Sequence, residues 1–166
     1  MQRWTRGLTR SREPFASKSN LILQKLRAAA SASSAAECCA SHGSYLPEHV
    51  LLDGQRTVAI DWDEYGVGDP SVDVAWFIVG VQRLAQKHFS SLHQLDEITE
   101  VFLRTYISSG RRETLGRLPF YRAAECLHRA KRDLASQTEG WRERAEAMLD
   151  ESLRNLSAYP ECGGTS

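Results

Sequence analysis

The stretch His42–Phe77, HGSYLPEHVLLDGQRTVAIDWDEYGVGDPSVDVAWF, decides how this chain is interpreted. It joins a histidine- and glycine-containing turn, a short apolar run, the acidic sequence Ile-Asp-Trp-Asp and then Gly-Asp-Pro. No other part of the chain is this rich in turn residues, histidines and carboxylates at once. Three interpretations are open at this point, namely a phosphoryl-transfer site, the remains of such a site, or a structural hairpin.

The length and composition are those of an ordinary globular domain. The chain has 166 residues, which suits one domain with a real core. Its 21 basic side chains equal its 21 acidic ones, so the formal net charge is zero and nucleic acid is not an expected partner. No apolar run approaches the roughly 20 residues that span a bilayer, so no membrane association is expected.

The cysteines predict a reducing environment. The four cysteines form no CxxC pair and have no Cys/His spacing typical of a metal site; they are Cys38, Cys39, Cys126 and Cys162. The N-terminus has no apolar segment of the secretory type. We therefore expect reduced cysteines in a cytoplasmic protein.

Three segments are expected along the chain. Residues 1–20 are rich in arginine and serine and poor in acid, which predicts a disordered basic tail, with a mitochondrial transit peptide as the alternative. Residues 21–158 are predicted to form the folded domain. Residues 159–166 are predicted to be a flexible tail.

The folded part is predicted to be α+β and mainly helical. A β-hairpin is expected over residues 50–61, with a turn signal at Asp53-Gly54 and the returning strand over residues 57–60. Apolar spacing and helix stop signals predict helices over residues 21–36, from Asp73 onward, over 91–108, from Pro119 onward and after Gly140.

The acidic motif is a candidate metal site. Asp61 is expected at the end of the returning strand, and Asp63 follows two residues later. Mg²⁺ prefers oxygen ligands and is often held by one or two carboxylates together with substrate phosphates. Taken alone the spacing is weak support, because paired carboxylates are common at exposed turns.

The order of the motifs resembles the aminoglycoside phosphotransferase family, within the choline-kinase-like and protein-kinase-like group. Members look like HGDxxxxNxLxD, a hairpin, IDWE or IDFD, and then GDPxxDxA. The matching segments here are His42-Gly43, residues 50–53, residues 60–63, and Gly68-Asp69-Pro70 with Asp73. The resemblance covers roughly residues 20–157 and implies a protein-kinase-like C-terminal lobe whose short β-hairpin carries the site.

The resemblance also implies roles for five residues. Asp61 would bind Mg²⁺ and Asp63 would support the metal or the site. His42 would brace the catalytic loop, and His49 stands where the family has an Asn that is a second metal ligand near the nucleotide. Ser44 stands at the position of the catalytic Asp, and a hydroxyl is a poor substitute for a carboxylate base. The carboxyl of Asp61 should then face an open pocket beside the turn that holds Ser44 and His49.

The implied cofactors are ATP and Mg²⁺, and the implied acceptor is a small hydroxyl or amino compound. The sequence before His42 shows no strand pattern of a nucleotide-binding lobe, so the isolated chain is expected to be inactive or nearly so. The alternative is a non-catalytic binding or scaffold module that pairs with an N-terminal lobe or with a second copy. A nucleic-acid contact by the basic tail is a third and weaker interpretation.

Overall fold

The computed structural model describes residues 13–32, 37–110, 112 and 114–158. The chain divides into two compact units, which are a helical unit (residues 1–34 and 122–166) and a loop–hairpin unit (residues 35–121). Helix α5 (Thr114–Ser136) contributes its first turns to the loop–hairpin unit and its remainder to the helical unit. The predicted α+β, mainly helical class is confirmed. Within the part of the chain that is described, no helix is both long and apolar enough to cross a membrane.

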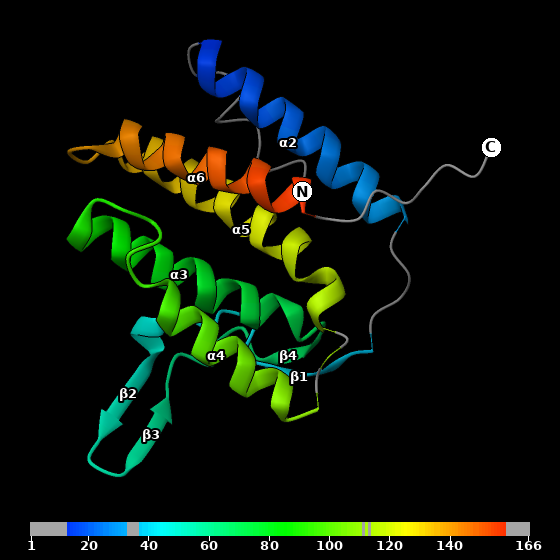
Figure 1. The fold of residues 1–166 in the computed structure, drawn as a ribbon, viewed down its shortest axis with the longest axis vertical. Coiled ribbons are helices and arrows are strands. Elements are labelled where there is room, and N and C mark those ends of the chain that lie inside the picture. The colour runs from blue at the N-terminus through cyan, green and yellow to red at the C-terminus, as the bar shows by residue number, and fades with distance from the viewer. Residues whose placement is uncertain (1–12, 33–36, 111, 113, 159–166) are drawn as a thin grey trace. The chain divides into compact units, whose positions relative to one another are not determined.

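The helical unit is built from α2 (Glu13–Ala32), the later turns of α5, and α6 (Trp141–Ser157). Helix α2 packs along α6 (Figure 1). Its Lys18 ammonium lies 2.7 Å from Asp150 and 3.0 Å from Glu146 on that helix. The largest fully buried apolar side chains of the unit are Ile22, Leu26, Met148 and Leu149.

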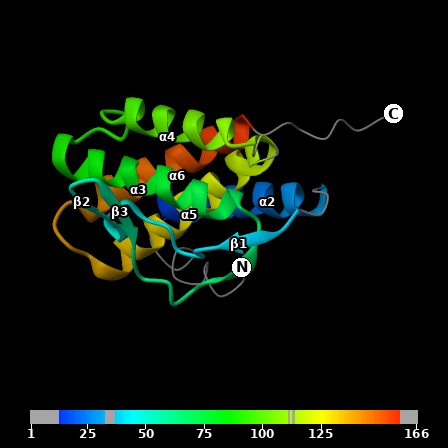
Figure 2. The same cartoon turned by 90° about the horizontal axis from the view of Figure 1, so that it is seen from below.

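The loop–hairpin unit contains two small antiparallel sheets and two long helices (Figure 2). Its elements are β1 (Cys39–Ser41), the 3-10 helix η1 (Pro47–His49), β2 (Val50–Asp53), β3 (Arg56–Ala59), β4 (Gly66–Gly68), α3 (Ser71–Phe89) and α4 (Asp96–Ser108). Strands β2 and β3 form the hairpin, whereas β1 pairs with β4 from Cys39↔Gly68 to Ser41↔Gly66. The β1–β4 pairing ties the start of the histidine loop to the Gly-Asp-Pro motif.

Helices α3 and α4 lie side by side and supply the core beneath the loop (Figures 1 and 2). Apolar side chains on the facing sides of these helices pack against the first turns of α5. The buried core residues are Val74, Ala75, Ile78 and Leu118, and Phe102, Leu103, Tyr106 and Tyr121 pack against them. The helix that follows Asp73 therefore buries one apolar face in the core, as its apolar spacing predicted.

The first helix starts earlier than predicted. It begins at Glu13, so residues 13–20 of the expected disordered tail are helical. Tertiary contacts explain this, since Ser19 is fully buried and Lys18 pairs with α6. Residues 1–12 and the predicted tail 159–166 lie outside the described residues.

Three other boundaries also shift. Helix α4 starts at Asp96 rather than residue 91, where Asp96 and Glu97 place negative charge in its first turn. Helix α5 starts at Thr114, with Pro119 inside it, because Leu118 is anchored in the core. In the hairpin, Asp53 pairs with Arg56, so Gly54-Gln55 rather than Asp53-Gly54 forms the tip.

Glycine at position 80 lets η1 approach α3. A Cβ at Gly80 would lie 2.5 Å from Pro47 Cδ and 3.1 Å from Pro47 Cγ. These distances are below ordinary van der Waals contact, and the proline ring cannot swing away as a flexible side chain would. Glycine has poor helix propensity, but at position 80 its lack of a side chain leaves room for η1, which leads from the loop into the hairpin.

We predict that Gly80→Ala destabilises the protein by about 1–3 kcal/mol, because overpacking outweighs the better helix propensity of alanine. Gly116→Ala is the matched control, since a Cβ there meets nothing within 4 Å and position 116 is also helical. That control should stabilise by about 0.5–1 kcal/mol. Denaturant unfolding measures both variants, and equal effects of the two substitutions would contradict the close packing of η1 on α3.

Candidate functional site

The Asp73 carboxylate organises the histidine loop. From the first turn of α3, its Oδ2 accepts hydrogen bonds from Ser41 Oγ and from the His42 backbone N–H, each at 2.7 Å. Its Oδ1 accepts from the Gly43 backbone N–H at 2.9 Å. Hydrogen bonds to a carboxylate are stronger than neutral ones, so this residue braces the loop from below.

Gly43 allows the loop to pass close to the acidic segment. Its φ of +83° lies in the left-handed region that favours glycine. A Cβ at this position would lie 2.2 Å from the carbonyl oxygen of Glu64. The loop backbone therefore packs directly on the backbone that follows the Asp61–Asp63 motif.

His42 links the loop to the end of the hairpin, as its predicted bracing role requires. Its side chain is buried, and Nε2 lies 2.8 Å from the Ile60 carbonyl oxygen. Because a carbonyl oxygen only accepts, Nε2 carries a proton, which leaves Nδ1 as an acceptor in the neutral ring. Ser44 Oγ lies 3.5 Å from this Nδ1, so the hydroxyl expected to stand at the base position faces a histidine rather than a carboxylate.

The structure brings His49 and Asp61 together. Asp61 Oδ2 lies 3.1 Å from His49 Nε2. The backbone supports this pair, because Ile60 N–H donates to the His49 carbonyl oxygen at 3.0 Å. Asp61 has a φ of +67°, a left-handed conformation that aspartate adopts more readily than most residues. It lies beyond the last residue of β3, so strand alternation does not place Asp63 on its face.

These residues do not by themselves form a magnesium site. Among the described residues, no three His, Cys, Asp or Glu side chains converge on one point. Asp61 offers one half-exposed carboxylate, His49 offers a nitrogen that Mg²⁺ accepts poorly, and Asp63 is exposed and forms no three-ligand group with them. Any Mg²⁺ here would need most of its oxygen ligands from phosphate and water.

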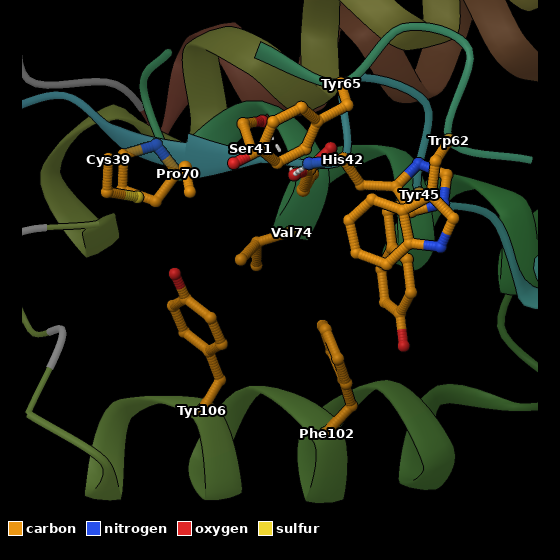
Figure 3. A pocket seen from close by; sticks show the side chains of 12 residues that line it. Cys39, Ser41, His42, Tyr45, Trp62, Tyr65, Pro70, Val74, Phe102 and Tyr106 are labelled. Carbon is orange, nitrogen blue, oxygen red and sulfur yellow. Dashed lines mark hydrogen bonds between the residues drawn. The ribbon is translucent and has the colours of Figure 1, made fainter. Parts of the chain in front are cut away.

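A cavity of about 490 Å³ opens beside the loop (Figure 3). It is lined by Cys39, Ala40, Ser41, His42, Tyr45, Trp62, Tyr65, Pro70, Asp73, Val74, Phe102 and Tyr106. Phe102 and Tyr106 point from α4 toward Val74, while His42, Tyr45 and Trp62 gather at one end and Cys39 and Pro70 at the other (Figure 3). Ser44, His49, Asp61 and Asp63 are not among its lining residues.

The expected position of Asp61 is therefore met only in part. It contacts His49 beside the turn that holds Ser44, yet it does not line the aromatic cavity. Sequence reasoning missed the aromatic lining of that cavity. Tyr45, Trp62 and Tyr65 stand close together in the motif stretch, and that cluster was the available signal.

Asp69 fixes the other side of the cavity. Its Oδ1 accepts the Ser71 backbone N–H at 2.9 Å, which is the local hydrogen bond by which aspartate forms turns. Its Oδ2 lies 2.8 Å from Arg117 Nε on α5. Burial, together with the charge of Asp69 and a hydrogen bond to it, raises the pKa of Tyr121 to about 12. Asp69 thus anchors the start of α3 to the first turns of α5.

Comparison with known families settles the kinship. The sequence model of the phosphotransferase enzyme family matches residues 2–98, which is more than half of the chain. The chain belongs to this family. The family match contains the histidine loop, the hairpin, the Asp61 motif and the Gly-Asp-Pro motif in their expected order.

Two solved structures share the fold of this family member. A thermostable mutant of an aminoglycoside phosphotransferase, in its apo form, is 20% identical with a TM-score of 0.58, and the match covers 93% of this chain and 47% of that one. A choline/ethanolamine kinase family protein from Mesorhizobium loti is 18% identical with a TM-score of 0.58, covering 95% and 56%. The chain thus spans about half the length of these structures. No curated protein sequence matches it.

We predict that Asp73→Asn destabilises the protein by about 2–3 kcal/mol. An amide nitrogen would then face at least one of the three donors, and the loss of a charge-assisted hydrogen bond is typically worth about 1.5–3 kcal/mol. Ser41→Ala is the matched control and should cost about 1 kcal/mol, because it removes one donor and leaves the carboxylate in place. Denaturant unfolding at neutral pH measures both, and an Asp73→Asn variant as stable as the Ser41→Ala control would contradict the bracing role.

Proposed function

We propose that this chain is the acceptor-binding half of a small-molecule phosphotransferase, and that it transfers phosphate very slowly or not at all by itself. In the reaction proposed for the complete fold, the γ-phosphoryl group of ATP passes to a hydroxyl or amino group of a small acceptor. The proposal places the protein in the cytoplasm, where its cysteines would stay reduced. The observation that carries it is the Asp73-braced loop, in which Ser44 contacts His42 and the ring of His42 stacks on His49 of the His49–Asp61 pair.

The bracing geometry supports the phosphotransferase half of the proposal. Phosphoryl transfer depends mainly on positioning and on charge stabilisation, so its loop must be rigid. Here the three hydrogen bonds to Asp73 and the contact of His42 with Ile60 hold the start of the loop to α3 and to the end of the hairpin. Bound Mg²⁺ would supply charge stabilisation for the phosphates, and Asp61 is the carboxylate best placed to contact it.

Ser44 carries the proposed catalytic weakness. A general base takes the acceptor proton and typically contributes about 10²–10⁴-fold to the rate. A serine hydroxyl cannot do this near neutral pH without help from a stronger base. The ring nitrogen in contact with it, His42 Nδ1, belongs to a buried histidine whose other nitrogen is engaged with the Ile60 carbonyl, so its lone pair is directed at the serine hydroxyl.

We predict that Ser44→Asp raises phosphate transfer by about 10²–10⁴-fold over Ser44→Asn, because only the former restores a carboxylate base. The assay follows radiolabelled γ-phosphate from Mg·ATP to a panel of amino and hydroxyl compounds, with Mg·ATP binding measured separately by calorimetry. Ser44→Asn has the shape of the aspartate without its basicity and serves as the matched control.

Two outcomes of this assay would count against the proposal. Robust turnover by the natural chain that survives Ser44→Ala would show that the serine is no defect. Absence of Mg·ATP binding by all variants would remove the phosphotransferase half and favour the second candidate function.

The second candidate is a non-catalytic module that pairs with another copy of the chain through the β-hairpin. The apolar side chains of β2–β3 and the following residue are unusually exposed, with Leu52 at 79% and Leu51 at 48%. Val58 and Ile60 are exposed at 46% and 40%. Leu51 lies opposite Val58, so these two share one face of the hairpin, whereas Leu52 lies on the other face. Apolar side chains that gather on one exposed face mark interaction sites more often than isolated exposed residues do.

If the hairpin mediates pairing, light scattering should show a dimer that Leu52→Asp converts to a monomer. The added carboxylate would be desolvated in such an interface, which opposes association. Gln55→Asp is the control, since it adds the same charge at the exposed hairpin tip without removing an apolar contact. A natural chain that is monomeric at all concentrations tested would rule out this function.

A further inference from the structure

The rings beside the cavity form one continuous series. From Tyr65 the centroid distances run 5.9 Å to Trp62, 4.5 Å to His42 and 5.5 Å to Tyr45. They continue 5.4 Å to Phe77, 4.1 Å to Phe102 and 6.3 Å to Tyr106. We call these seven residues the aromatic arc. All of them except Phe77 line the cavity, and they come from the loop, the acidic segment, α3 and α4.

The lining offers little to a cationic ligand. Asp73 is the one carboxylate among the lining residues, and both of its oxygens already accept hydrogen bonds from the loop. Burial, with a smaller contribution from the charge of Asp73, raises the pKa of Tyr45, so this phenol also stays uncharged at neutral pH. Asp61, with its carboxylate on His49, does not line the cavity.

The balance of interactions favours a neutral ring over an ammonium group. A primary ammonium that enters an apolar cavity loses strongly held water, and without an available carboxylate the ring faces, at about 0.5–2 kcal/mol per contact, recover only part of that loss. A quaternary ammonium loses less and is therefore the stronger competitor. A flat neutral ring has no such penalty. It gains from apolar burial and from offset or edge contacts with each neighbouring ring.

We propose that this cavity binds a flat, uncharged aromatic compound carrying a hydroxyl group. The volume of about 490 Å³ falls within the range of small-molecule sites and suits a ligand of two or three fused rings. The inference rests on the proposed function only for the role of the hydroxyl, which would be the acceptor group at the end of the cavity where His42 contacts Ser44. Binding of the ring itself depends on the aromatic arc.

The test is calorimetric titration of the full chain with 2-naphthol, without nucleotide, and with choline and neamine as a quaternary ammonium and a polycation. We expect 2-naphthol to bind at least tenfold more tightly than either cation. Trp62→Ala should weaken 2-naphthol binding by about tenfold, and Trp62→Phe should recover most of it. Trp62 is half exposed, so its removal should leave the fold intact.

Val67→Ala is the matched control, because Val67 is 81% exposed and does not line the cavity. Circular dichroism verifies that each variant is folded. Tighter binding of choline or neamine than of 2-naphthol would overturn the proposal. Equal loss of binding in Trp62→Ala and Val67→Ala, or no loss in either, would also overturn it, because binding would then not depend on the arc.

The outcome is separable from that of the proposed function. If 2-naphthol binds through Trp62 while Ser44→Asp stays inactive, the ligand class stands and the phosphotransferase proposal fails. If Ser44→Asp transfers phosphate to an amino compound while 2-naphthol does not bind, the proposed function stands and the ligand class is wrong.

Discussion

Three donors that converge on the Asp73 carboxylate set the shape of the loop–hairpin unit. Ser41 is the last residue of β1, and His42 and Gly43 open the loop, so one side chain fixes the point where strand becomes loop. Asp73 is itself fixed by the first turn of α3, which packs on the core through Val74 and Ala75. The packing of α3 on the core therefore determines the conformation of the loop, and with it the position of Ser44. A loop of this kind can keep its conformation after its chemistry has changed.

The two sides of the site have different characters. On one side are polar groups, namely the Ser44–His42 contact and the His49–Asp61 pair. On the other side the aromatic arc lines a cavity whose single carboxylate is occupied by the loop. His42 belongs to both, because its ring contacts Trp62 and Tyr45 while its nitrogens face Ile60 and Ser44. The motif stretch supplies His42, Tyr45 and Trp62 as well as the polar groups, whereas Phe102 and Tyr106 come from α4.

The sequence predicted most of what depends on local pattern. The hairpin and the helix after Gly140 followed from spacing, and the bracing role of His42 was implied by the family resemblance. What it could not predict depends on contacts distant in sequence. The early start of α2 requires α6, the start of α5 before Pro119 requires the core position of Leu118, and the pairing of β1 with β4 joins residues 39–41 to 66–68. The cavity was missed for the same reason, since Phe102 and Tyr106 come from a helix far along the chain.

The close approach at Gly43 separates what can change in this loop from what cannot. The Glu64 peptide occupies the space where any side chain at position 43 would begin. Substitution there would push two backbone segments apart, whereas its neighbour Ser44 makes one long side-chain contact and could be exchanged with little steric effect. Position 43 is therefore restricted to glycine, whereas position 44 accepts other side chains. A substitution at position 44 could therefore alter the chemistry of the loop while position 43 keeps the backbone path unchanged.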